Sequence, residues 1–304
     1  MRNAPEWVKN LVLGVAAWVV SIPVVRKTLR SLRDRGLVPD RVARSLALRG
    51  EIPISLPWAP PFLMCSGPRN ALVRALYFSP RQGDEPETLA VFVDLIGNAR
   101  VFVDVGANQG LFTLVATAIN PEVRVHAFEP NPSVNGLLRA NIAANRLMDR
   151  VTVSPQVVSD QAGVVEFRVP ESPYSAAGAM SAVSLSPGGA VVGLPAVRLD
   201  DVLGDEQLDV LKIDDEGAEA RVIRGARKTL RRTRPVVILE VLEPHDNAGA
   251  ERLLRDLGYE FYHLTADGPV RSHALVPDLK REYRNYLCLP AGRRLPGAER
   301  GVAT

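Results

Sequence analysis

The sequence has 304 residues, is 46% hydrophobic and carries a formal net charge of +3 at pH 7. This length allows one large domain with an extension or two small domains, and the hydrophobic content supports a packed core. Basic residues do not alternate with aromatic clusters, which excludes the usual footprint of a nucleic-acid-binding protein. The histidines show no metal-ligand spacing, so no histidine-bound metal site is expected. Cys65 and Cys288 are interpreted as free thiols in a reducing, cytoplasmic compartment.

Residues 1–50 are predicted to form a helical extension that contains an apolar segment at 11–25. This segment is shorter than the roughly 20 residues that a membrane-spanning helix needs. Residues 11–35 fit an interfacial helix with a basic flank, which would bring a cytoplasmic protein to a membrane surface. A helix packed on the main domain or on a second subunit is the alternative. A signal peptide is disfavoured, because the basic residues follow the apolar run.

A helix is predicted at 38–48, within the extension. Residues 51–100 are predicted to be a lead-in segment with extended pieces at 51–66 and helices at 70–78 and 88–96. From residue 101, strands and helices alternate through a main domain at 101–290, and a tail follows at 291–304. Strands are expected at 101–105, 123–128, 151–154, 209–213, 236–241, 259–264 and 283–289, with a strand pair at 156–159 and 163–169. Helices are expected at 109–119, 133–145, 217–231 and 247–257. This alternation predicts an α/β fold whose mainly parallel sheet has helices on both faces.

Two further features concern the edges of this domain. The last strand lacks a convincing helix before it, so it can pair antiparallel. Residues 170–195 are rich in Ser, Gly, Ala and Pro without a period, which predicts a long loop. A lid over the site and a disordered insertion both fit this loop.

A glycine turn directly after the strand at 101–105 is the most informative motif. Its glycines are spaced G-x-x-x-G and not G-x-G-x-x-G, the spacing of dinucleotide-binding turns. Asp104 places a negative charge beside the turn, which favours a cationic ligand over a pyrophosphate. S-adenosylmethionine carries an ammonium and a sulfonium group and fits that charge. The candidate cofactor contacts here are Asp104, Gly106, Ala107, Asn108 and Gly110.

Other charged residues follow neighbouring strands. Glu129 ends the second strand, where one carboxylate can bind both hydroxyls of a ribose, although it could instead cap the next helix. Lys212, Asp214 and Glu216 lie at the carboxyl end of another strand, where ligands bind in open α/β sheets. The structural alternative for Lys212 is an ion pair with one of these acids. The structural alternative for the acids is the preference of negative charge for a helix N-terminus. His245 follows the strand at 236–241 and is a candidate base or an ordinary surface histidine.

Three motifs in this order resemble the FkbM family of S-adenosylmethionine-dependent methyltransferases: Asp-Val-Gly-Ala-Asn-Gln-Gly (104–110), Phe-Glu-Pro-Asn-Pro (128–132) and Lys-Ile-Asp-Asp-Glu-Gly-Ala-Glu (212–219). The resemblance covers residues 82–290 and departs from the family pattern at Asp215, where an apolar residue is more usual. It implies a class I (Rossmann-like) methyltransferase fold with a seven-stranded sheet. The glycine turn would then face the methionine end of the cofactor and Glu129 its ribose. Ser159 and Asp160 are candidates for its adenine end, and a turn between two strands is the alternative for them.

The resemblance implies methylation of a hydroxyl on a glycan, a lipid-linked sugar or a polyketide-type metabolite. A hydroxyl acceptor must lose its proton, and Asp214, Glu216 and His245 are the candidate bases, with Lys212 beside them. An NAD-binding oxidoreductase and a non-catalytic binding protein are the alternatives, and the glycine spacing counts against the first. The run of acids at 214–216 also offers the oxygen ligands of a divalent cation. The sequence leaves the oligomeric state open.

Overall fold

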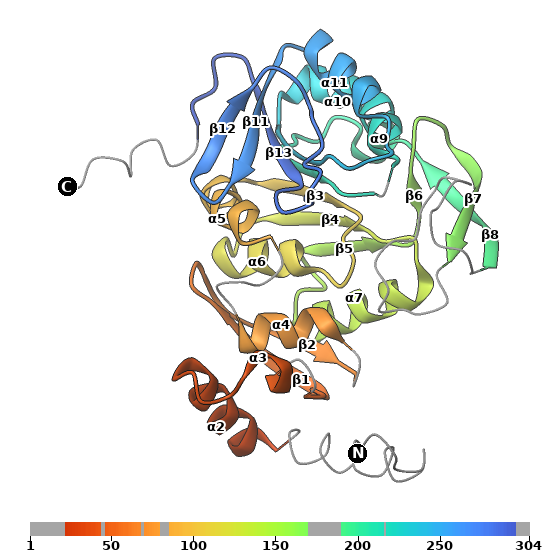
Figure 1. Ribbon diagram of the computed structural model, residues 1–304. Helices are drawn as coiled ribbons and strands as arrows, with labels where there is room; N and C mark the ends of the chain where they lie inside the picture. The colour runs from red at the N-terminus through yellow and green to blue at the C-terminus, as the bar shows by residue number, and fades with distance from the viewer. Residues whose placement is uncertain are drawn as a thin grey trace. The chain divides into compact units, whose positions relative to one another are not determined.

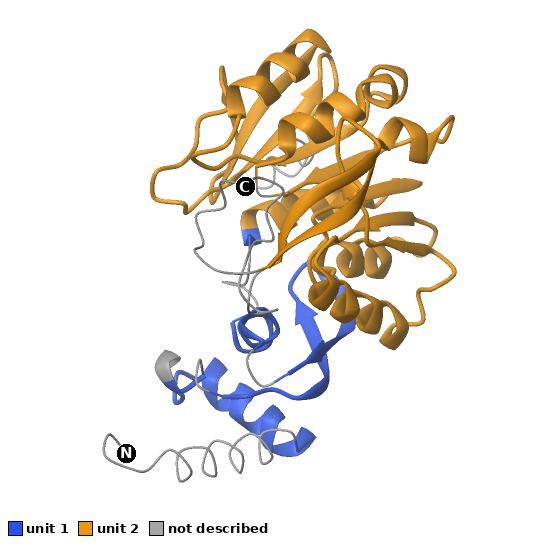
Figure 2. Ribbon diagram, turned by 90° about the vertical axis from the view of Figure 1, so that its right-hand side faces the viewer, with its two compact units in different colours: residues 1–86 blue, residues 87–304 orange. Residues whose placement is uncertain are grey.

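The computed structural model describes residues 22–43, 46–67, 70–79, 85–169, 190–215 and 217–295. The chain divides into two compact units, residues 1–86 and residues 87–304, which Figure 2 shows in different colours. Most of the apolar segment at 11–25 and of the loop at 170–195 lies outside the described residues, as does the end of the tail at 291–304. Their interpretations therefore stay predictions. None of the described helices combines the length and the apolar character that a bilayer crossing requires.

A β-hairpin and a covering helix form the centre of the first unit. Its elements are α2 (Pro23–Asp34), α3 (Asp40–Ala43), β1 (Gly50–Leu56), β2 (Ala59–Ser66) and α4 (Ala71–Phe78). The two strands pair antiparallel, with Ile52 opposite Met64 and Ile54 opposite Phe62. Alternate residues of a strand point to one face, and all four of these side chains are buried. Because α4 contacts both strands, it helps to cover the hairpin.

Helix α3 is a single turn, whereas the sequence predicted a helix over residues 38–48. Among the residues of this stretch whose burial the structure describes, Val38, Ala43 and Leu48 are buried. They recur every five positions, which does not match the spacing of three or four on one face of a helix. The chain is irregular from residue 46 until β1 begins.

Two arginines of α2 turn toward their own unit. The guanidinium groups of Arg26 and Arg30 lie 5.7 and 5.1 Å from the ring centroid of Tyr77 in α4. A cation over an aromatic face is attracted by the electron-rich ring. Part of the basic flank at 26–35 is thus engaged within the first unit.

The second unit is built around an eight-stranded sheet (Figure 1). Its helices are α5 (Pro86–Ile96), α6 (Leu111–Ile119), α7 (Pro132–Ala144), α8 (Leu199–Leu203), α9 (Glu219–Gly225), α10 (Arg227–Thr233) and α11 (Asn247–Asp256). Its strands are β3 (Val101–Val105), β4 (Arg124–Phe128), β5 (Val151–Ser154), β6 (Val157–Val158), β7 (Gly163–Val169), β8 (Ala190–Val197), β9 (Val210–Ile213), β10 (Val236–Glu240), β11 (Tyr259–Thr265), β12 (Gly268–Ser272) and β13 (Asn285–Pro290).

The strand order of the large sheet is β12-β11-β13-β10-β9-β3-β4-β5. The five strands from β10 to β5 are parallel, and β13 runs antiparallel between β10 and β11. This arrangement confirms the predicted α/β class and the antiparallel last strand. The sheet has one strand more than expected, because β12 forms a hairpin with β11. Gly268 and Pro269 begin β12, and such residues are weak strand signals.

Helices cover both faces of this sheet, with α5, α6 and α7 on one side and α9, α10 and α11 on the other (Figure 1). On the first face, Phe92 of α5 contacts Phe102 of β3, with ring centroids 5.0 Å apart, and also Phe112 of α6. On the second face, Val103 of β3 belongs to a buried cluster with Val222 of α9. A parallel sheet buried on both faces needs continuous apolar strands, which explains the sequences of β3, β9 and β10.

Two local predictions are corrected by the structure. The strands expected at 156–159 and 163–169 do not pair with each other, because β6 and β7 each pair with β8 in a separate three-stranded sheet. Most of β8 lies within the predicted loop at 170–195. The helix predicted at 217–231 is two helices that meet at Ala226. The preceding Gly225 packs directly on β6, since a Cβ there would lie 2.0 Å from the Ser159 carbonyl oxygen.

Candidate active site

Four neighbouring parallel strands of the sheet, β3, β4, β9 and β10, end at one edge, and acidic residues lie at each end. Asp104 is the penultimate residue of β3, Glu129 follows β4, Asp214 follows β9 and Glu240 ends β10. The Asp104 and Asp214 charges both raise the pKa of Glu129, which shows that three of these groups lie within electrostatic reach of one another. The structure therefore brings the predicted acids together at the carboxyl edge, where open α/β sheets bind ligands.

The glycine turn is held against the neighbouring strands by its backbone. The N–H groups of Gly106 and Ala107 both donate to the Phe128 carbonyl, at 3.0 and 2.9 Å. Gly106 has φ +74°, and a Cβ at this position would lie 1.8 Å from the Asp214 carbonyl oxygen. Glycine is therefore required here for the close approach of two strand ends, which is a structural reason separate from the predicted contact with a cofactor.

Gly110 also allows a close approach, at the start of α6. Its φ is +88°, and a Cβ would lie 2.5 Å from the Leu138 side chain of α7. Between the two glycines, Asn108 also adopts a positive φ, of +51°. The turn thus reverses the chain sharply between β3 and α6. Contact of this turn with a cofactor stays a prediction.

The Glu129 carboxylate is fixed by two backbone hydrogen bonds. The Asn108 N–H donates to its Oε2 at 2.9 Å, and the Asn131 N–H donates to its Oε1 at 2.8 Å. Only 7% of the residue is exposed. Burial raises the pKa of Glu129 to about 7, with a smaller contribution from Asp104 and Asp214, although the two backbone hydrogen bonds oppose this rise. Glu129 is thus poised between its neutral and its charged form.

This raised pKa predicts a pH dependence of stability that Glu129→Gln removes. Between the unfolded pKa of 4.5 and about 7, the folded protein holds a proton that the unfolded chain has lost. The contribution of Glu129 to the free energy of unfolding is therefore fully present below pH 4.5 and declines as pH rises to about 7, by about 3 kcal/mol in all. Urea unfolding across this range should show the decline in the wild-type chain and a flatter profile in the variant. Parallel profiles for both proteins would contradict the assignment.

Lys212 belongs to a layer of largely buried charged side chains, with Asp104 and Asp214, at the carboxyl edge of the sheet. It is opposite Asp104 on the neighbouring strand, so both side chains share one face of the sheet. The Lys212 Nζ donates to Asp214 Oδ2 at 2.7 Å and lies 4.6 Å from the ring centroid of Phe112. Thr113 Oγ1 donates to Asp104 Oδ2 at 2.7 Å. The ion-pair interpretation of Lys212 is therefore confirmed, and the lysine also contacts α6 through Phe112.

The two acids that flank Lys212 respond differently to it. Burial raises the pKa of Asp104 despite the Lys212 charge and the hydrogen bond from Thr113. Burial acts in the same direction on Asp214, but the charge and hydrogen bond of Lys212, together with Glu240 and Arg284, outweigh it and hold the pKa of Asp214 below its usual value. A carboxylate with a depressed pKa is a weak proton acceptor, so Asp214 is a poor candidate for the base.

Glu240 is a member of this layer that sequence reasoning missed. The Glu240 carboxyl lies beside Asp214 and helps to lower the pKa of Asp214, and its Oε1 lies 3.3 Å from Arg284 Nη1. In register beside it on β13, Asn285 donates from Nδ2 to Thr88 Oγ1 at 3.0 Å. The sequence signal that could have identified Glu240 is an acid at the end of a strand of buried aliphatic residues. An unpaired charge there would be costly, so such an acid is expected to have a partner.

The remaining predicted residues lie around this centre. Asp160 follows β6 and accepts a hydrogen bond from Arg224 Nε of α9 at 3.0 Å. Although burial opposes it, this Arg224 contact holds the pKa of Asp160 below its usual value. His245 follows β10 and lies against Gly217. Glu216 lies outside the described residues, so its role stays a prediction.

A family model for the methyltransferase FkbM domain matches residues 104–261, which is just over half of the chain. The chain belongs to the FkbM methyltransferase family. The predicted site residues of this methyltransferase, from Asp104 to His245, all lie inside the matched range. Arg284 and Asn285 lie beyond it, although the sheet brings them to Glu240. Membership of this family identifies the chain as a methyltransferase and argues against the oxidoreductase alternative.

Two curated relatives show how far the similarity extends. The methyltransferase sdnD of Sordaria araneosa is 31% identical over 188 residues, which cover 52% of this chain and 73% of that protein. The 31-O-demethyl-FK506 methyltransferase FkbM of Streptomyces tacrolimicus is 34% identical over 179 residues, which cover 49% of this chain and 67% of that protein. The crystal structure of a methyltransferase FkbM from Methylobacillus flagellatus KT overlaps 89% of this chain and 60% of its own, with 15% identity and a TM-score of 0.43.

Proposed function

We propose that this methyltransferase binds S-adenosylmethionine at the carboxyl edge of β3, β4 and β9 and transfers its methyl group to a hydroxyl oxygen. The Glu129 carboxylate carries the proposal. Each of its oxygens accepts one backbone N–H, from Asn108 and from Asn131, and keeps a second acceptor site. A carboxylate that is fixed in this way and retains two acceptor positions fits the two adjacent hydroxyls of a ribose.

The charge of the edge also fits this cofactor. Asp104, Asp214 and Glu129 lie near one another, and Lys212 supplies the positive charge among them. Asp214 is ionised and Glu129 becomes ionised above pH 7, so these carboxylates favour a cation over a pyrophosphate at the edge. The ammonium and sulfonium groups of S-adenosylmethionine would be held by Asp104 and the turn at 106–110. The cofactor would supply an electrophilic methyl group there.

The acceptor is proposed to be a small organic molecule with a free hydroxyl, from the glycans, lipid-linked sugars or polyketide-type metabolites. The name of the Streptomyces tacrolimicus relative specifies methylation at an oxygen, which supports the same chemistry here. Methyl transfer is an in-line displacement, so holding acceptor and methyl group in line supplies much of the rate, roughly 7–11 kcal/mol in ideal cases. Contact of residues 11–35 with a membrane would favour a lipid-linked acceptor.

Glu129→Ala should weaken S-adenosylmethionine binding at least about tenfold. A hydrogen bond to a charged group contributes about 1.5–3 kcal/mol, and the variant loses both bonds to the ribose. Isothermal titration calorimetry above pH 7, where the carboxylate is ionised, measures the loss directly. A parallel titration with NAD separates the two nucleotide chemistries. Unchanged S-adenosylmethionine affinity in the variant, or binding of NAD alone by the wild-type chain, would contradict the proposal.

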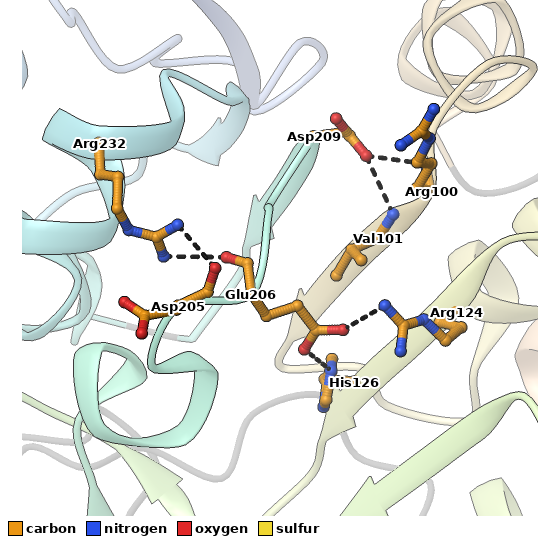
Figure 3. A network of polar contacts seen from close by, with 8 residues as sticks. All are labelled: Arg100, Val101, Arg124, His126, Asp205, Glu206, Asp209 and Arg232. Carbon is orange, nitrogen blue, oxygen red and sulfur yellow. Dashed lines mark hydrogen bonds and ion pairs between the residues drawn. The ribbon is translucent and has the colours of Figure 1, made fainter.

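Glu206→Ala is the matched control for this experiment. Glu206 precedes β9 and forms ion pairs with Arg124 at 2.8 Å and His126 at 2.9 Å, as Figure 3 shows. Nearby, Asp209 accepts the N–H groups of Arg100 and Val101 where β3 begins. This network lies at the amino-terminal edge of the parallel strands. We therefore expect Glu206→Ala to leave cofactor affinity unchanged, which would show that losing an acid elsewhere in the sheet does not weaken binding.

A further inference from the structure

A histidine and a glutamate form a pair beside the proposed cofactor edge. His245 lies in the turn between β10 and α11, and Glu219 is the first residue of α9. The His245 Nδ1 is buried and lies 3.8 Å from Glu219 Oε2. Their side chains are 15% and 4% exposed. The pair is thus largely shielded from water, although it lies just beyond the carboxyl ends of β9 and β10.

The turn after β9 shapes this pair. The Gly217 N–H donates to Glu219 Oε1 at 2.9 Å, which fixes the carboxylate and leaves Oε2 as the oxygen nearer to the histidine. Gly217 has φ +101°, and a Cβ there would lie 3.2 Å from His245 Cδ2. The absence of a side chain at Gly217 therefore lets the imidazole lie flat against the turn.

The chemistry of the two groups defines the tautomer of His245. A buried ring nitrogen needs a hydrogen-bond partner, and Glu219 Oε2 is the acceptor that faces Nδ1. An ionised carboxylate only accepts hydrogen bonds, so a bond between Glu219 and the ring requires the proton to be on Nδ1. The lone pair of the neutral ring then lies on Nε2. The separation of 3.8 Å exceeds a hydrogen bond, but such contacts are often long before substrate binds.

Burial and one neighbouring positive charge favour this neutral form at pH 7, although nearby acids oppose them. Burial lowers the pKa of His245, and the positive charge of Arg281 from the segment before β13 acts in the same direction. Asp214 opposes this shift from the end of β9. From α9, an ionised Glu219 also favours the protonated ring, while Asp246 is engaged as the cap of α11 and accepts the Gly249 N–H.

We propose that His245 is the general base of the methyl transfer and that Glu219 is the positioning residue that orients it. This inference rests on the proposed function. The acceptor O–H bond breaks and its proton passes to His245 Nε2. The oxygen forms a bond to the methyl carbon as the carbon–sulfur bond breaks, and the electron pair of that bond stays on sulfur. Lys212 holds Asp214 as an ionised partner, so the histidine is the better proton acceptor of the two.

The test is a pH titration of the full chain labelled with ¹⁵N-histidine, followed by two-bond ¹H–¹⁵N NMR spectra of the imidazoles. His245→Gln identifies the signals of His245 among the four histidines of the chain. We expect the neutral ring to carry its proton on Nδ1. Glu219→Gln should lower the titration midpoint of His245 by about one pH unit or more, because an opposite charge this close shifts a pKa by about 1–3 units. A neutral ring protonated on Nε2, or an unchanged midpoint in Glu219→Gln, would overturn the pair.

Two comparisons keep this test specific. Glu251→Gln changes an acid of α11 that pairs with Arg255, so the midpoint of His245 should not move. Calorimetry with S-adenosylmethionine on His245→Gln and Glu219→Gln should show wild-type affinity, because neither residue is assigned to the cofactor. If the wild-type chain fails to bind the cofactor, the proposed function fails by itself. If binding is normal but the histidine signals do not respond to Glu219→Gln, only the inference about the pair fails.

Discussion

Gly106→Ala should lower the free energy of unfolding by more than about 3 kcal/mol. A Cβ at residue 106 would lie 1.8 Å from the Asp214 carbonyl oxygen, so the ends of β3 and β9 would have to separate. The Asp214 N–H donates to the Val105 carbonyl at 3.0 Å, and this separation would break that bond. Forced overpacking alone costs about 1–3 kcal/mol, and the positive φ adds about 1–2 kcal/mol for a side chain. Urea unfolding measures the change.

Gly268→Ala provides the matched control in the same unit. Gly268 begins β12 with φ +97°, and no atom lies within 4 Å of a Cβ placed there. The substitution therefore has the backbone strain without the clash, and we expect a loss of about 1–2 kcal/mol. Equal losses at the two positions would show that strain alone, rather than the close approach of β3 and β9, explains Gly106.

Lys212→Met should destabilise the chain by about 3–5 kcal/mol near pH 7. The side chain of Lys212 is 3% exposed and donates to Asp214, and its charge also reaches Asp104. Methionine fills a similar volume but leaves the acids without their cation, and breaking a buried pair by removing one partner costs about this much. Chemical unfolding monitored by circular dichroism measures the loss.

The pH dependence of this loss identifies its cause. The pKa of Asp214 is depressed in the folded protein, so its pairing with Lys212 contributes stability above the unfolded pKa of 3.8 and loses it as pH falls further. The deficit of Lys212→Met should therefore shrink as pH falls toward and below 3.8. Lys228→Met, at an exposed lysine of α10, should change stability by less than about 0.5 kcal/mol. A deficit of Lys212→Met that does not vary with pH would indicate lost packing instead of lost charge.

Local patterns predicted the parallel core of the second unit well. The runs at 101–105, 209–213 and 236–241 are apolar because both faces of a parallel sheet are covered, and this signal needs no tertiary information. Acids at the ends of the strands at 101–105, 123–128 and 209–213 were expected at one edge, because the carboxyl ends of parallel strands lie at the same edge of a sheet. Asp104, Glu129 and Asp214 do come together there.

Segments whose partners lie far along the chain were harder to predict. The pairing of β6 and β7 with β8 depends on a strand that follows a segment without period. The break between α9 and α10 coincides with the contact of Gly225 on Ser159, which are 66 positions apart in sequence (225 − 159). Neither contact can be recognised from the spacing of apolar residues. That spacing shows which face of an element is buried but not which element packs on it.

The sequence by itself determined the fold class, the family and the edge that carries the acids, because strand ends and glycine turns are encoded by adjacent residues. Only the tertiary structure decided what each polar group contacts. It assigned Gly106 to the approach of two strands, Lys212 to a buried ion pair and Glu240 to the same layer. It also placed Glu219 beside His245. Such contacts depend on the distances between elements, and burial makes each of them energetically decisive.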